Sequence, residues 1–317
     1  MPLQDNGIEI KRYNATDADL WNAFVDRSKN GTFLFSRGFM DYHADRFHDH
    51  SLMVYANDSL CALLPANQSG QTLISHAGLS YGGFVTDDKM SAARMLDIFQ
   101  SLVGWMRAQD FAALRYKAVP AIYHRQPAEE DIYALFRMGA ELVRVDVAAT
   151  VPVHRRLTFS KGKKDGLRKA RKAGLVVRKS NDWSACWELI TDVLAKRHDT
   201  APVHSLDEIQ LLAGRFPDSI CLYGAFDADR MVSALVVFDC GQTAHVQYIA
   251  SSDAGRANGG VDAIVNHLLE ADFSRHDWFD FGISTTDAGR DLNAGLAAQK
   301  EMFGARSTTC LTYELAL

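Results

Sequence analysis

The sequence predicts an α/β protein with a mixed sheet, built as two tandem domains related by duplication of one fold. Three observations lead to this prediction. The chain has 317 residues, which is enough for two domains. Strand-like segments recur at an offset of about 165–170 residues, and the same order of helices and strands follows them in both halves. Hydrophobic residues make up 47% of the chain and charged residues 23%, as in an ordinary folded protein.

Each half begins its sheet with three strand-like segments. In each half a polar turn, 57–58 or 227–229, separates the first two segments, which is typical of an antiparallel hairpin. The segments are 51–55, 60–64 and 72–76 in the first half, and 219–223, 232–236 and 244–249 in the second.

Helical periodicity comes next in both halves. Apolar residues spaced three or four apart over 95–106 and 261–269 predict amphipathic helices. A strand, a second helix and a Gly-Ala pair that opens a last strand follow each of them. These are 112–117, 127–137 and 139–140 in the first half, and 278–282, 291–302 and 304–305 in the second. The capping box of Ser205 and Glu208 predicts one further helix start.

A basic segment separates the two halves. Eleven Lys and Arg residues and one acid, Asp165, lie between Arg155 and Lys179, so this stretch carries about +10 although the whole chain is at -5. We predict an N-terminal domain over 1–154, a basic connector helix over 155–174 and a C-terminal domain over 175–317. The basic segment either holds an anionic ligand or is a solvated linker.

Neither a signal peptide nor an apolar stretch of the ~18–20 residues that span a bilayer is visible. The five cysteines are scattered through apolar segments, which favours free thiols in a reducing compartment. We therefore expect a cytoplasmic protein without a transmembrane segment. His43, His48 and His50 alternate with aspartates but match no standard ligand spacing, so we predict no metal site. The oligomeric state is not indicated.

The order of elements resembles the N-acetyltransferase (GNAT) fold, and its duplication resembles the Fem-type aminoacyltransferases. The local marks of this resemblance are 75–83, the basic 164–174 and 293–305. The last is similar to the Phe-Lys-x-x-Phe-Gly ending of Fem-type enzymes, with Gln299 in place of the first aromatic residue. The resemblance covers nearly the whole chain, although 155–174 is too short for the coiled-coil arm of some Fem enzymes. It implies acyl transfer to an amine, with the cleft in or near the second copy.

Five residues of the second copy are candidate catalytic residues. The resemblance implies that Lys300 stabilises the oxyanion of the tetrahedral intermediate. Tyr248 can protonate a leaving group and His245 can deprotonate an attacking amine, but a regular strand points them to opposite faces unless it is bulged. His204 is a candidate base or acceptor contact, and Asp280, with Lys300 as its candidate partner, lies between aromatic residues. Each can instead be a packed structural residue.

The segment 256–261 is the candidate phosphate loop of the donor. It follows a strand and opens a helix, where glycines let backbone N–H groups approach a pyrophosphate. The resemblance implies a loop of the form Gln/Arg-x-x-Gly-x-Gly/Ala, from which Val261 departs, and a donor arm lying along strand 244–250. An ordinary turn is the alternative. The candidate donor-binding residues are Arg256, Asn258, Gly259 and Gly260.

Candidate acceptor-binding residues lie mainly in the first copy. Its Tyr-Gly-Gly turn permits close approach of a phosphate or sugar, although the copy can also be retained for structure alone. These candidates are Tyr81, Gly82, Gly83, Lys117, Tyr123 and, from the basic segment, Arg168.

The sequence thus predicts an enzyme that moves an acyl or aminoacyl group from a thioester or ester donor to an amine of an anionic cell-envelope precursor. We expect no tightly bound cofactor and acyl-CoA as co-substrate, with aminoacyl-tRNA as the less favoured donor because the net charge is negative. Two other interpretations stay open. One is a non-catalytic GNAT-fold binding protein, which the imperfect loop favours. The other is nucleic-acid binding by the basic segment, which lacks the expected aromatic residues.

Overall fold

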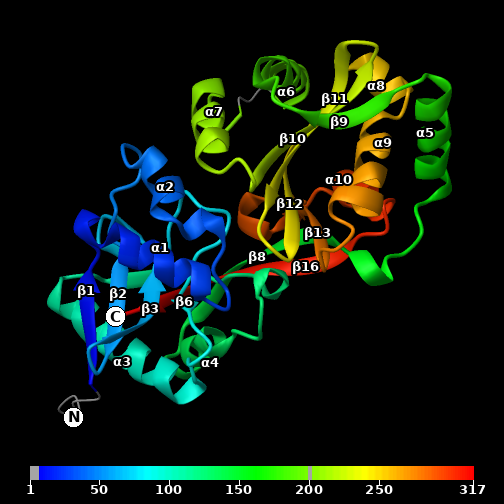
Figure 1. Ribbon diagram of the computed structural model, residues 1–317. Helices are drawn as coiled ribbons and strands as arrows, with labels where there is room; N and C mark the ends of the chain where they lie inside the picture. The colour runs from blue at the N-terminus through cyan, green and yellow to red at the C-terminus, as the bar shows by residue number, and fades with distance from the viewer. Residues whose placement is uncertain (1–6, 199–201) are drawn as a thin grey trace. The chain divides into compact units, whose positions relative to one another are not determined.

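The computed structural model describes residues 7–198 and 202–317, which form two compact units (Figure 1). The first unit contains the chain up to Asp146 together with Asp287–Arg290 and Thr309–Leu317, and the second contains Val147–Thr286 and Asp291–Thr308. Each unit is therefore assembled from separate stretches of sequence. Within the described ranges, no helix is long and apolar enough to cross a lipid bilayer.

The first unit combines two groups of strands with helices that cover them. In one group β1 (Ile8–Arg12), β2 (Leu52–Ala56), β3 (Ser59–Leu64) and β6 (Val85–Thr86) are antiparallel in that order. In the other, β4 (Asn67–Ser69), β5 (Thr72–Ile74), β7 (Ala113–Lys117) and β16 (Arg306–Ala316) are neighbours, and only the β5 and β7 pair is parallel among these. The α-helices are α1 (Ala18–Arg27), α2 (Arg37–Met40), α3 (Ala92–Ala108) and α4 (Glu130–Arg137).

The core of the first unit lies where the helical periodicity predicts it. Ile98, Phe99 and Leu102 on one face of α3 are buried against Leu52 of β2 and Leu114 of β7. Burial of each such side chain contributes about 1.5–3 kcal/mol to folding. The strand-like segments of the first half are therefore divided between two groups of strands, β2 and β3 in one and β5 in the other, and α3 packs against both groups.

The second unit is a mixed sheet with helices on both faces. Its strand order is β8 (Glu141–Pro152), β13 (Trp278–Ile283), β12 (Thr243–Ser251), β11 (Arg230–Asp239), β10 (Ile220–Asp227) and β9 (Val176–Ser180). These neighbours are antiparallel except for β12 and β13, which are parallel. A small hairpin pairs β14 (Thr285–Thr286) with β15 (Asp291–Leu292). The α-helices are α5 (Lys161–Lys172), α6 (Trp183–His198), α7 (Leu206–Arg215), α8 (Asp253–Ala257), α9 (Gly260–His267) and α10 (Ala294–Glu301).

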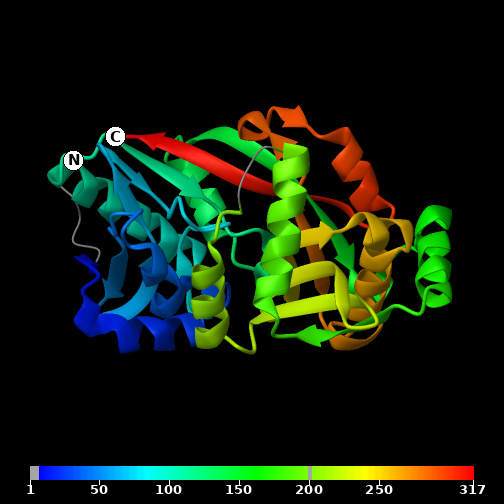
Figure 2. The same ribbon diagram turned by 90° about the horizontal axis from the view of Figure 1, so that it is seen from above.

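A bulge in β12 decides which side chains reach each face of this sheet. Val246 is buried with α9, whereas Tyr248 packs its ring on Trp187 of α6. The two helices lie on opposite faces of the strands of the second unit (Figure 2). Residues two apart would share a face of a regular strand. The pairing with β11 skips Gln247, so the alternation shifts at this residue. The bulge therefore places Tyr248 on the same face as His245.

The order of elements in the first half of the chain recurs in the second. The series β2, β3, β5, α3, β7, α4, β8 corresponds to β10, β11, β12, α9, β13, α10, β16. In both series the third strand pairs in parallel with the strand after the helix. The mixed α/β fold class is confirmed.

The final strands of the two series are exchanged. β8, which ends the first series, pairs with β13 of the second, and β16, which ends the second series, pairs with β7 of the first. The exchange explains why the units are discontinuous in sequence. The linear division into 1–154, 155–174 and 175–317 stays a prediction, because a repeat offset shows where copies begin and not which strands pair.

Candidate active site

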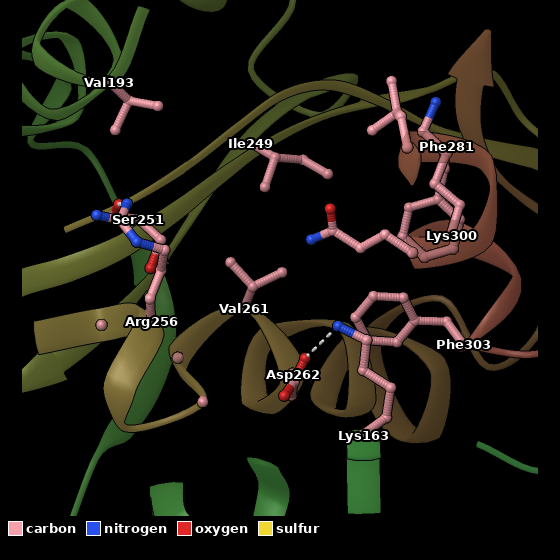
Figure 3. Close-up of a pocket in the computed structure, with 15 residues that line it drawn as sticks. Lys163, Val193, Ile249, Ser251, Arg256, Val261, Asp262, Phe281, Lys300 and Phe303 are labelled. Carbon is pink, nitrogen blue, oxygen red and sulfur yellow. Dashed lines mark hydrogen bonds and ion pairs between the residues drawn. The ribbon is translucent and has the colours of Figure 1, made fainter. Parts of the chain in front are cut away.

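A pocket of about 310 Å³ opens in the second unit where β12 and β13 separate. The two strands pair through Thr243–His245 and Trp278–Asp280. Beyond these pairs both strands are bulged, at Gln247 in β12 and between Asp280 and Ile283 in β13. Ile249 from β12 and Phe281 from β13 then face the same pocket (Figure 3). Strand geometry therefore creates an opening in an otherwise continuous sheet.

The walls of this pocket are mostly apolar. Val261 points into it from the start of α9, opposite Ile249, and Phe303 closes it next to Lys300 (Figure 3). The apolar side chains are Val193, Ile249, Val261, Phe281, Leu296 and Phe303. The polar and charged ones are Lys163, Ser251, Arg256, Asp262, Gln299 and Lys300. Such a pocket suits a flexible, largely apolar arm that carries one polar reactive group.

The predicted phosphate loop forms the turn between α8 and α9. Arg256, Gly259 and Gly260 line the pocket, and Asn258 is not among its lining residues. Gly259 is the N-cap of α9 with φ of +70°, and a Cβ there would lie 2.3 Å from the carbonyl oxygen of Gly166. A Cβ on Gly260 would lie 2.2 Å from Oγ of Ser233. Close packing against the protein itself thus requires both glycines.

The cations near this turn have partners within the protein. Nζ of Lys163 lies 2.9 Å from a carboxylate oxygen of Asp262. The guanidinium of Arg256 donates to the Ser251 carbonyl and pairs with Asp253. The donor end of the pocket therefore already has its charges compensated.

Lys300 lies at the opposite end of the pocket and is only 6% exposed. Its Nζ donates to the carbonyl oxygens of Gly282 at 2.9 Å and Ile283 at 2.6 Å. Burial lowers the pKa of Lys300 from 10.5 to about 8, and the charge of Asp280 partly opposes this effect. The ammonium group is thus held by backbone carbonyls.

Asp280 contacts the ring of His245 and one backbone N–H group. One of its carboxylate oxygens lies 2.9 Å from Nδ1 of His245, and the other accepts from the Gly282 N–H at 2.8 Å. The charge of Asp280 also raises the pKa of Lys300. The bulge of β13 turns the N–H of Gly282, at φ of +71°, toward the carboxylate. Asp280 therefore fixes the orientation of the His245 ring.

Tyr248 and His204 form a second polar pair, on the face covered by α6. The Tyr248 hydroxyl accepts from the backbone N–H of His204 at 3.2 Å and lies 2.6 Å from Nδ1 of its ring. Nε1 of Trp187 donates to the His204 carbonyl at 3.2 Å. Burial raises the pKa of Tyr248, so its hydroxyl stays protonated at neutral pH. Neither residue is among those that line the pocket.

The candidate acceptor residues of the first unit are largely brought together. The rings of Tyr81 and Tyr123 lie 4.4 Å apart, and the N–H of Gly82 donates to the Lys117 carbonyl at 3.1 Å. Burial lowers the pKa of Lys117 to about 8, and its Nζ donates to two carbonyls of the loop that contains Leu79. Gly83 adopts φ of +85° beside the Tyr116 hydroxyl.

Arg168 lies in the second unit, on α5. Its side chain is 70% exposed and forms an ion pair with Asp165. Among the described residues no group of three or more His, Cys, Asp or Glu side chains is arranged to hold a metal ion.

Sequence reasoning missed Lys163 and Asp262 as pocket residues. Lys163 was treated only as one of the cations of the basic segment, which we expected either to hold an anionic ligand or to be a solvated linker. The signal was a buried stripe, because Lys163, Gly166 and Ala170 follow one another at helical spacing and are the buried residues of α5.

Residues 159–289 match the family model of the acetyltransferase (GNAT) domain. The second unit thus carries a domain of the GNAT superfamily, and the fold of the whole chain is Fem-like, as the following structures show.

Three solved structures share this fold over nearly their whole length. FemX has a TM-score of 0.70 at 12% identity, with 98% of this chain and 97% of that chain covered. L-PGS from Bacillus licheniformis has a TM-score of 0.63 at 11% identity, with 95% and 91% covered. A tandem GNAT protein from the clavulanic acid biosynthesis pathway has a TM-score of 0.52 at 10% identity, with 98% of each chain covered. No curated protein sequence matches this chain.

Proposed function

We propose that the chain transfers an acyl or aminoacyl group from a thioester or ester donor to an amine. The observation that carries this proposal is the opening between β12 and β13, which ends at the buried ammonium of Lys300. A donor arm lying along β12 would bring its carbonyl group to this lysine. The GNAT family match supports the same class of reaction.

Lys300 would stabilise the oxyanion that forms when the amine attacks. An ammonium group has three N–H donors, and the carbonyls of Gly282 and Ile283 take two of them. The third is then available for the developing negative charge. Because the backbone holds the group in place, little reorganisation is needed during reaction, and one such donor is typically worth 10²–10³ in kcat.

His245 would remove the proton from the attacking amine. Asp280 holds Nδ1 of the ring, so Nε2 is the atom that accepts the proton. Tyr248, with His204 beside it, is the candidate that would give a proton to the leaving group, since its raised pKa keeps the hydroxyl protonated. Both residues lie on the α6 face, so this role requires that the leaving group reach them through the opening between β12 and β13. The cycle closes when His245 releases the proton of the amine to solvent and the Tyr248 phenolate takes one up.

The donor in this proposal is acyl-CoA or an aminoacyl-tRNA, bound along Arg256, Asn258, Gly259 and Gly260. The acceptor is an anionic, amine-bearing cell-envelope precursor in the cytoplasm, as the Fem-type resemblance implies. Its binding residues in the first unit would be Tyr81, Gly82, Gly83, Lys117 and Tyr123, and Arg168 of the second unit is a separate candidate contact. A second candidate is a non-catalytic ligand-binding protein, which is favoured by the compensated charges of the phosphate loop.

Transfer of labelled acyl groups to amine acceptors tests the proposal. Purified full-length protein is assayed with acyl-CoA and charged tRNA donors, as wild type, Lys300→Met and the control Lys89→Met, which alters an exposed lysine. We expect Lys300→Met to lower kcat by about 100-fold and the control to leave it unchanged. If Lys300→Met keeps the wild-type kcat, Lys300 does not stabilise the oxyanion. A donor that binds but is never transferred would favour the non-catalytic candidate.

A further inference from the structure

The protein's own charges occupy the start of α9. Asp262 lies in the first turn of this helix, where a carboxylate satisfies the positive end of the helix dipole. Its partner Lys163 comes from α5, and the dashed line in Figure 3 marks their contact of 2.9 Å. The two side chains are only 15% and 11% exposed, and both line the pocket. The helix start that we predicted to bind pyrophosphate therefore already holds an anion.

The surrounding packing fixes this ion pair in place. A Cβ on Gly166 would lie 1.8 Å from Oδ2 of Asp262, so the backbone of α5 closes directly over the carboxylate. Nζ of Lys163 also lies 4.0 Å from the centre of the Phe303 ring, which adds a cation–π contact. α5 packs along α9 (Figure 1). The pair is thus a built part of the pocket wall.

The charges at this end of the pocket balance. Lys163 is matched by Asp262, and Arg256 is matched by Asp253 and by the Ser251 carbonyl. A diphosphate placed here would face the Asp262 carboxylate and would have to break an ion pair that is shielded from water. Like charges brought together out of water repel each other strongly.

We propose that Asp262 is a donor-selectivity residue. Its carboxylate takes the position at the start of α9 that a donor's pyrophosphate would take. The pocket then selects acyl esters or thioesters whose arm is uncharged and whose phosphates, if any, lie outside it. This inference rests on the proposed function, and it names the class of donor that the same site accepts.

Calorimetric titration with two thioesters that differ in their phosphates tests the inference. Acetyl-pantetheine carries the arm of acetyl-CoA without the nucleotide and its phosphates. Asp262→Asn keeps the shape of the side chain and removes its charge. We expect this variant to bind acetyl-CoA roughly tenfold more tightly than wild type, and acetyl-pantetheine with less than a threefold change. Higher salt should reduce the gain for acetyl-CoA.

Glu270→Gln is the matched control, because it removes a carboxylate that follows the same helix and is outside the pocket. Glu270→Gln should change the affinity neither for acetyl-CoA nor for acetyl-pantetheine. If circular dichroism shows that Asp262→Asn does not fold, Asp262→Ser replaces it in the titrations. The inference is overturned if the Asp262 variant binds acetyl-CoA no better than wild type, or if both thioesters gain equally. Binding needs no turnover, so absence of transfer activity would count against the proposed function alone.

Discussion

Replacement of Lys300 by Met should change how the stability of the protein depends on pH. Burial lowers the pKa of this lysine from 10.5 to about 8 in the folded state. Below pH 8 the Lys300 side chain is protonated in both the folded and the unfolded protein, so the cost of burying its charge lowers the free energy of unfolding in full. Between pH 8 and 10.5 the folded protein releases the proton first, so the unfolded state binds more protons and stability rises with pH.

The size of the effect follows from the two pKa values. One pH unit corresponds to 1.36 kcal/mol per proton, so the interval from about 8 to 10.5 corresponds to about 3 kcal/mol. Lys300→Met removes the charged group and with it this contribution. The difference in the free energy of unfolding between wild type and variant should therefore shift by about 3 kcal/mol in favour of wild type on going from pH 7.5 to 10.5.

Urea denaturation followed by circular dichroism at several pH values between 7.5 and 10.5 measures this difference. Other groups that titrate in the range are the same in both proteins, so their effects cancel. Lys89→Met, which alters an exposed lysine, is the control and should follow wild type. A constant difference between wild type and Lys300→Met across the range would refute the reasoning.

Three further predictions concern packing and the polar pairs. Gly259→Ala and Gly174→Ala both place Ala at φ near +70°, which costs about 1–2 kcal/mol of stability in each variant. Only the Cβ at position 259 meets a backbone oxygen of α5, so Gly259→Ala should lower the free energy of unfolding, measured by urea denaturation, by about 1–3 kcal/mol more than Gly174→Ala does. Equal losses would contradict this packing. Tyr248→Phe leaves the buried backbone N–H of His204 without its acceptor and should cost about 1–3 kcal/mol, seen as a lower melting temperature. Asp280→Asn should lower kcat on the order of 100-fold with donor affinity unchanged, whereas unchanged turnover would exclude the residue from proton transfer.

The fold was predictable because its signals are local and occur twice. Each strand-like segment and amphipathic helix of the first half has a counterpart at the expected offset, and each falls on a strand or helix of the structure. The capping box at Ser205 is present with both of its hydrogen bonds. Exchange of β8 and β16 was not predictable, because the choice of pairing partner leaves no trace in the periodicity of a single strand.

The candidate site was predictable in part, for a related reason. Lys300, Arg256, Gly259 and Gly260 all line one pocket, as their places in the repeat suggest. The partner of Asp280 could not be predicted, since it depends on a bulge that turns one backbone N–H. Bulges shift the alternation of side chains without any marked change in composition.

The exchange of final strands has a consequence for how the chain folds during synthesis. β7 (Ala113–Lys117) receives its neighbour only when Thr312–Ala316 have been made, about 200 residues later. At a translation rate of about 5–20 residues per second, the edge of β7 waits for roughly 10–40 seconds without this partner. An unpaired strand edge can pair with another nascent chain. The first unit thus exposes one unpaired strand edge until the last residues are made, although its own sequence emerges first.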